Sequence, residues 1–201
     1  MYPPSLQRLI DQFTRLPGIG QKSAARMALF VMRSRSDLAE GLARSLMEVK
    51  EKIRLCSTCF NLTDEDPCAI CRDPRREDGT LCVVETPDDQ LALEAAGIFK
   101  GRYHILHGNL SPLDGVGPGD LRVSELLRRL DGGSVREIII ATNPTLEGET
   151  TAAFLRKVLS EKNGDLAISR IALGVPMGGS LTYMDRMTLE HALKRRTPMK
   201  T

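Results

Sequence analysis

The chain has 201 residues, of which 41% are hydrophobic and 27% are charged, as in a folded globular protein rather than a disordered one. Only 4% are aromatic and none is tryptophan, which disfavours a surface that binds single-stranded nucleic acid by base stacking. The apolar runs are too short for a membrane span, and the first residues lack the pattern of a secretory signal. We therefore expect a cytoplasmic protein without membrane partners.

The formal net charge of +2 hides an uneven distribution. Residues 1–54 and residues 151–201 each carry a net charge of +5, whereas residues 55–90 carry −6 and residues 91–150 carry −2. Basic ends around an acidic middle are a hint of nucleic-acid contact. Solvated helix surfaces produce the same pattern, so the charge alone leaves both interpretations open.

The first 54 residues are predicted to be helical. Apolar residues follow the 3.6-residue period from position 6 to position 16, and a second helix is expected over 22–33. A third helix is expected from Asp37, which can act as its N-cap. This helix has an apolar stripe at five positions: Leu38, Leu42, Leu46, Val49 and Ile53.

The turn between the first two helices has features of a phosphate-binding element. The glycines of Pro17-Gly18-Ile19-Gly20 allow a tight turn whose backbone amides can approach a phosphate at the start of the next helix. Lys22 and Arg26 lie four residues apart on one face of that helix, where both can contact a nucleic-acid backbone. The pattern resembles a helix-hairpin-helix, which binds DNA without reading bases. The alternative is a plain helix corner with solvated basic residues.

Residues 55–80 are acidic, show neither helical nor strand periodicity, and contain four of the five cysteines. Cys56 and Cys59 form one CxxC pair, and Cys68 and Cys71 form a second pair after eight residues. Two such turns present four thiolates to one ion, which is typical of a closed structural Zn²⁺ site. Four free thiols in a loop are the alternative. Cys82 lies in an apolar segment and is expected in the core.

From Leu81 onward, short apolar segments alternate with helical ones. Strands are predicted at 81–85, 103–106, 137–142 and 169–175, with helices near 88–97, 121–130 and 150–162 and a last helix over 189–196. Such alternation predicts a mostly parallel sheet with helices on its faces. The predicted fold class is α/β, in a multi-module α+β chain with four parts: 1–54, 55–80, 81–175 and 176–201.

Acidic residues follow two of these strands. Glu85 closes the first, with Asp88 and Asp89 after it, and the third is followed by the residues NPTLEGE at 143–149. This resembles the Toprim domain of topoisomerases and primases, in which a glutamate and a DxD pair hold Mg²⁺. In the alignment with DxDxEG, the two aspartates fall on Asn143 and Thr145. Neutral side chains hold a hard cation less well, so we expect no catalytic residues here.

The order of these features resembles the RecR family of recombination mediator proteins over essentially the whole chain. The motifs are LPGIGxKSA, the four cysteines, a Toprim domain with Glu85 and NPTxEG, and a GVPxGGSLTYxDxxTL tail. The resemblance implies a bacterial DNA-repair protein that works with RecO and RecF to load RecA onto single-stranded DNA. It also implies a ring-like homotetramer assembled through the N-terminal helices and the C-terminal segment.

Carried over by motif, the resemblance implies particular roles for the site residues. Cys56, Cys59, Cys68 and Cys71 would hold one structural Zn²⁺ per chain. Lys22 and Arg26 would face single- or double-stranded DNA without sequence preference. Glu85, Asp89 and Glu147 would form an acidic face that docks a partner.

Two other classes of function compete with this prediction. One is a Mg²⁺-dependent Toprim nuclease or topoisomerase-like enzyme, which is disfavoured by Asn143 and Thr145. The other is a zinc-containing scaffold that binds only proteins, which is disfavoured by the basic hairpin at Lys22 and Arg26.

Overall fold

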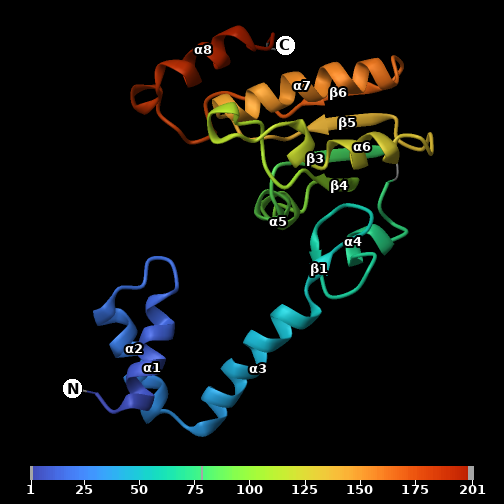
Figure 1. Cartoon of the computed structure of the whole chain (residues 1–201). Coiled ribbons are helices and arrows are strands. Elements are labelled where there is room, and N and C mark those ends of the chain that lie inside the picture. Colours follow the sequence, from blue (N-terminus) through green and yellow to red (C-terminus); the bar gives the residue numbers. More distant parts are fainter. Residues whose placement is uncertain (1, 78, 199–201) are drawn as a thin grey trace. The chain divides into compact units, whose positions relative to one another are not determined.

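The computed structural model describes residues 2–77 and 79–198 (Figure 1). The chain divides into two compact units, Met1–Ile53 and Arg54–Thr201. None of the helices in the described part of the chain is both long enough and apolar enough to span a membrane.

The first unit contains the three predicted helices: α1 (Pro4–Thr14), α2 (Gln21–Arg33) and α3 (Ser36–Lys52). The first two pack together around the buried residues Ile10, Ala24 and Ala28. Alanines on α2 allow this close approach because they bring no side chain beyond Cβ. The partly buried residues that pack against this cluster are Leu6, Leu9, Phe13, Ile19 and Ala25.

The third helix differs from the prediction in its start and in its surroundings. It begins at Ser36 with Arg35 as N-cap, so Asp37 is not the cap. Its carboxylate instead accepts a hydrogen bond of 2.9 Å from the Leu38 N–H within the first turn. No residue of α3 is buried, and the predicted apolar stripe is exposed, with 62% of Leu46 accessible. In the described residues, the apolar stripe of α3 therefore remains largely accessible to solvent.

The second unit is built on a parallel four-stranded sheet, which confirms the predicted α/β class (Figure 1). Its strands are β3 (Thr80–Val84), β4 (Arg102–Ile105), β5 (Glu137–Ile140) and β6 (Ala167–Arg170), in the order β4-β3-β5-β6. The connecting helices are α5 (Pro87–Ala95), α6 (Val123–Arg129) and α7 (Leu146–Lys162). Short 3-10 turns lie at η1 (Pro112–Asp114), η2 (Pro118–Asp120) and η3 (Leu181–Tyr183), and α8 (Arg186–Lys194) is the last helix among the described residues.

Among the predicted elements whose bounds differ from the structure, three differ for a clear local reason. The last strand is 167–170 rather than 169–175, because pairing with β5 runs from Ala167 to Arg170 and one further bond joins Ile171 to Ile140. Helix α7 starts at 146 rather than 150, because the Thr145 hydroxyl caps it. Helix α8 covers 186–194 rather than 189–196, because the Asp185 carboxylate caps it.

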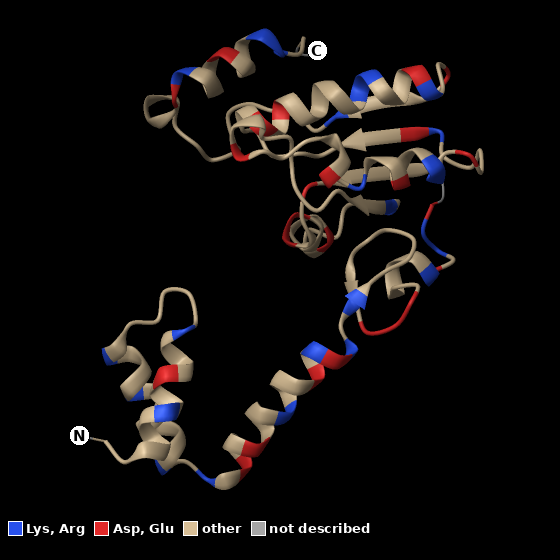
Figure 2. Ribbon diagram, viewed as in Figure 1, with Lys and Arg blue, Asp and Glu red and all other residues tan. Residues whose placement is uncertain are grey.

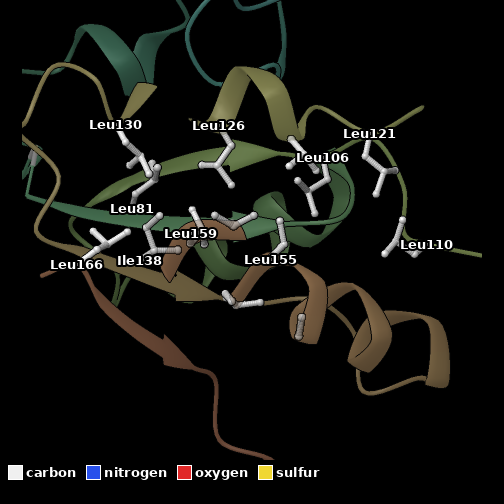
Figure 3. Packing of buried hydrophobic residues seen from close by; sticks show 14 residues of the cluster. Leu81, Leu106, Leu110, Leu121, Leu126, Leu130, Ile138, Leu155, Leu159 and Leu166 are labelled. Carbon is white, nitrogen blue, oxygen red and sulfur yellow. The ribbon is translucent and has the colours of Figure 1, made fainter. Parts of the chain in front are cut away.

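Alternate residues of the strands face two different cores. Leu81 and Val83 of β3 point to one core, which α6 and α7 cover with leucines such as Leu126 and Leu155 (Figure 3). Cys82 and Val84 point to the opposite core, so Cys82 is buried as predicted. That second core includes the four paired cysteines and Leu93 of α5. The cysteine segment therefore covers one face of the sheet.

Candidate functional site

The two CxxC pairs meet in one buried cluster. The sulfur atoms of Cys56, Cys59, Cys68 and Cys71 all lie within 4.8 Å of one another, and all four residues are buried. The first pair lies in a turn between β1 (Arg54–Leu55) and β2 (Leu62–Thr63), two short antiparallel strands. The second pair lies at the start of α4 (Ala69–Arg72), whose N-cap is Cys68.

Backbone hydrogen bonds hold both turns and connect them. The Cys68 N–H donates to the Cys56 sulfur over 3.3 Å, as an amide does to a thiolate. The Ser57 N–H donates over 2.7 Å to the Asp66 carboxylate, and this bond lowers the pKa of Asp66. The Cys59 thiol lies 3.6 Å from the Cys68 sulfur, and its hydrogen bond lowers the pKa of Cys68. The same hydrogen bond raises the pKa of Cys59, so one thiol of this pair keeps a proton that a bound metal ion would replace.

The cysteine segment is attached to the edge strand of the sheet. The Ile105 N–H donates to the Cys59 carbonyl over 2.9 Å, and His107 Nε2 lies 2.6 Å from the Phe60 carbonyl oxygen. The Phe60 ring packs edge-on against His104, with ring centroids 5.5 Å apart. Both histidines thus have structural roles.

A partly buried guanidinium beside the cluster supports a charged metal site. Arg129 and Phe60 help to line a pocket of about 500 Å³, and the Arg129 side chain donates to the Tyr103 carbonyl over 2.6 Å. It makes no ion pair with a carboxylate in the described part of the chain. Burial lowers the pKa of Arg129, while Cys71 and Cys59 act in the opposite direction. Four thiolates around one Zn²⁺ carry a net charge of −2, which would compensate this cation. The residues present therefore fit such an ion.

The helical hairpin presents an open helix start with basic side chains. Gly18 has φ +76°, a conformation that favours glycine. Gly20 is the N-cap of α2, and no described side chain caps this helix. Lys22 and Arg26 are exposed on α2, where Figure 2 marks the basic residues in blue. Both line a groove of about 650 Å³ together with Phe30 and other residues of this unit.

The acidic residues at the carboxyl end of the sheet do not form one exposed face. Glu85 is only 3% exposed, whereas Asp89 and Glu147 are partly exposed. Asp89 belongs to a capping box with Thr86 at the start of α5. The Asn143 side chain donates to the Glu85 carboxylate over 3.1 Å and to the Asp89 carboxylate over 3.4 Å. The structure thus brings Glu85, Asp89 and Asn143 together, while Glu147 makes no side-chain contact of this kind with the described residues.

Thr145, the second position that aligns with an aspartate of DxDxEG, caps the start of α7. Its hydroxyl accepts a hydrogen bond from the Gly148 N–H over 3.0 Å. Gly148 is buried, and a Cβ added to it would lie 2.1 Å from the Asn143 carbonyl oxygen. The loop that carries NPTxEG is thus tightly packed, and a side chain at 148 would displace it.

Several contributing residues were missed in the sequence. Asn109 donates to Glu85 over 3.0 Å. Arg170 donates to the carbonyls of Ile140 and Thr142 and pairs with Glu149 over 2.7 Å. Asn109 follows the predicted strand 103–106, and this placement near the carboxyl edge of a parallel sheet is the signal that could have identified it. Arg170 ends the observed strand β6 but lies near the start of the predicted strand 169–175, so no such signal marked it in the sequence.

The fold and these sites define a class of modular protein that joins a helical hairpin, a four-cysteine segment and a Toprim-like sheet. Comparison with known families supports each part. The family models that match are a RecR helix-hairpin-helix over 6–50, a RecR four-cysteine zinc finger domain over 53–73, a Toprim domain over 79–172 and a RecR C-terminal model over 174–197.

Relatives match almost the entire chain. The chain is 54% identical to recombination protein RecR of Syntrophobacter fumaroxidans, over 97% of this chain and 96% of the relative. It is 52% identical to recombination protein RecR of Pelotomaculum thermopropionicum, over 99% and 98% of the two chains. The RecR protein of Myxococcus xanthus is also 52% identical, over 98% of each chain. The chain belongs to the RecR family of recombination proteins.

Proposed function

We propose that the chain is a DNA-binding recombination mediator that acts with RecO and RecF to help load RecA onto single-stranded DNA. Residues 1–54 bind DNA in this proposal, residues 55–80 hold zinc, residues 81–175 form the Toprim domain and residues 176–201 serve assembly. In this proposal the protein acts in the cytoplasm, at the nucleoid. The observation that carries the proposal is the exposed, uncapped and basic start of α2.

Three features of that helix start favour a phosphate. The first N–H groups of a helix have no partner within the helix, and the macrodipole adds a partial positive charge there. Lys22 and Arg26 are exposed one turn apart and add two full charges. Such contacts position a nucleic-acid backbone without reading bases. We therefore propose binding to single- and double-stranded DNA without sequence preference.

The exposed apolar stripe on α3 supports assembly into a homo-oligomer. Leu38, Leu42, Leu46, Val49 and Ile53 are between 38% and 62% exposed. In the C-terminal segment, Leu181 and Tyr183 are also exposed, at 64% and 86%. Monomeric proteins rarely leave contiguous apolar surface uncovered. These two segments are the ones through which we propose a ring-like tetramer.

The cysteine cluster has a structural role in the proposal. Cys56, Cys59, Cys68 and Cys71 together hold one Zn²⁺, and a filled tetrahedral site leaves no open position for catalysis. The ion would supply the cross-link that this segment needs, because its two short strands and one short helix cannot form a core alone. Burial of all four sulfurs against the sheet supports a structural function.

We propose that the Toprim domain is non-catalytic and docks a partner through Asp89, Glu147 and the neighbouring exposed Asp88. Asn143 and Thr145 are neutral and engaged in hydrogen bonds, which supports the absence of phosphoryl-transfer chemistry. Glu85 lies beneath this surface. Its part in docking is therefore to hold the neighbouring loop rather than to touch the partner.

The DNA-binding part of the proposal is tested with two matched double variants. Lys22→Glu with Arg26→Glu reverses two charges on the hairpin, and Arg156→Glu with Lys157→Glu makes the same change on exposed positions of α7. Fluorescence anisotropy at low salt should show at least tenfold weaker DNA binding for the hairpin variant only. Equal losses in both variants would contradict a specific role of the hairpin. RecA assembly on single-stranded DNA in the presence of RecO then tests the mediator role.

A further inference from the structure

The carboxylate of Glu85 is buried and fully supplied with hydrogen-bond donors. One oxygen accepts from the Asn143 backbone N–H over 2.8 Å. The other oxygen accepts from the Asn143 side-chain amide over 3.1 Å and from the Asn109 side-chain amide over 3.0 Å. A buried carboxylate needs such compensation. Here three neutral N–H groups provide it.

This arrangement does not fit the Mg²⁺ ion that a Toprim domain implies. Mg²⁺ requires oxygen ligands in near-octahedral geometry, whereas two side-chain amide nitrogens donate to one Glu85 oxygen and the Asn143 backbone N–H donates to the other. The Asn143 amide also reaches Asp89 over 3.4 Å, so it lies between the two carboxylates. The third candidate ligand position, Thr145, is engaged as the helix cap.

We infer that the side-chain amides of Asn109 and Asn143 take the place of a divalent cation at this edge of the sheet. Glu85 is then a positioning residue that fastens the loop 142–148 without any metal. The inference also makes a prediction for variants of the chain: replacement of one of these two amides by a carboxylate, as in Asn143→Asp, creates a divalent-cation site. It goes beyond the proposed function, and it is tested on the protein alone, without DNA or partner.

The packing around Asn143 explains why the amide stays in place. The Asn143 carbonyl lies 3.4 Å from the Arg170 guanidinium, which also holds the Thr142 carbonyl over 2.9 Å. The Thr142 hydroxyl donates to the Gly148 carbonyl over 2.7 Å. These bonds fix the loop backbone on both sides of Asn143. Replacement of its side-chain nitrogen by oxygen therefore leaves the new carboxylate beside Glu85 and Asp89.

The experiment measures whether Mg²⁺ restores the thermal stability of Asn143→Asp. Without divalent cations this variant should melt below the wild type, since it loses one donor and gathers like charges. A concentration of 10 mM MgCl₂ is about a hundred times the dissociation constant that we expect for the new site. It should raise the melting temperature of the Asn143→Asp variant by about 5 °C or more. The comparison uses NaCl at equal ionic strength and no EDTA, which would also compete for zinc.

Two further variants make the result decisive. Asn61→Asp is the matched control, because the Asn61 amide donates to the Gln90 side chain over 2.8 Å and faces no carboxylate there. It and the wild type should respond to MgCl₂ by less than about 1 °C. Asn109→Asp places a second carboxylate next to Glu85 from a different loop. This variant replaces Asn143→Asp in the experiment if Asn143→Asp does not fold.

Manganese binding gives a readout that a purely structural role would not change. Electron paramagnetic resonance should detect one bound Mn²⁺ per chain in either Asp variant at 109 or 143, and none at this edge in the wild type. A wild-type chain that binds Mn²⁺ and loses it in Glu85→Gln would overturn the inference. Folded Asp variants that respond to neither cation would overturn it as well.

Discussion

Gly148 provides a sharp test of how tightly the NPTxEG loop is packed. A Cβ at this position would lie 2.1 Å from the Asn143 carbonyl oxygen and 2.8 Å from the Glu85 carboxylate. Ordinary contacts begin near 3.4 Å, so Gly148→Ala has to move the loop backbone by more than an ångström. Gly148 lies within α7 without a positive φ, so the conflict is one of space rather than of backbone conformation.

Two opposing effects set the size of the change. Overpacking of a rigid site costs about 3 kcal/mol, whereas alanine in a helix is favoured over glycine by about 1 kcal/mol. The net loss of about 2 kcal/mol in the free energy of unfolding lowers the melting temperature by roughly 4–8 °C for a chain of this size. Thermal unfolding followed by circular dichroism measures this shift.

Gly164→Ala is the matched control, because nothing lies within 4 Å of its added Cβ and its φ is not positive. It should stay within about 0.5 kcal/mol of the wild type. If Gly148→Ala melts at or above the temperature of Gly164→Ala, the loop is not packed as described, and the account of Asn143 and Glu85 loses its basis.

Two further predictions concern the zinc finger and a buried histidine. Elemental analysis should find one zinc per chain in the wild type and in Cys82→Ser, and none in Cys59→Ser; equal zinc in all three proteins would exclude the four-cysteine site. Burial lowers the pKa of His104 to about 4, below its unfolded value of about 6.5, so the unfolded chain binds the extra proton first as the pH falls. In urea unfolding, the contribution of His104 to the free energy of unfolding should therefore be about 2 kcal/mol smaller at pH 5 than at pH 7.5. A His104→Gln variant should lack this part of the pH dependence. An identical pH dependence in the two proteins would refute the prediction.

Local patterns were sufficient to predict most of the secondary structure. Helical periodicity located α1 and α2, and the alternation of apolar strands with helices predicted the parallel sheet. Errors arose where the ends of elements depend on pairing or caps. The apolar residues after Arg170 favoured a longer strand, but the chain leaves the sheet beyond Ile171. The Thr145 cap lies inside the NPTxEG motif, whose pattern indicates ligand chemistry rather than a helix start.

The candidate sites were predictable only to the extent that spacing determines them. Paired cysteines indicate a cluster because four sulfurs on two short turns can meet around one ion. The burial of Glu85 was not predictable in the same way, because Asn109 and Asn143 reach it from loops 24 and 58 residues away in sequence. The exposure of α3 was also hidden, since an apolar stripe is identical in sequence whether it faces its own chain or another copy.

The most direct test of the central claim is the salt dependence of DNA binding. Each phosphate contact contributes about 0.9 to the slope of the logarithm of the duplex-DNA affinity against the logarithm of the salt concentration. Anisotropy titrations between about 50 and 200 mM NaCl should give a slope for Lys22→Glu with Arg26→Glu that is shallower than the wild-type slope by about 2. The Arg156→Glu with Lys157→Glu variant should keep the wild-type slope. Equal slopes for the wild type and the hairpin variant would contradict the claim that this chain holds DNA through the start of α2.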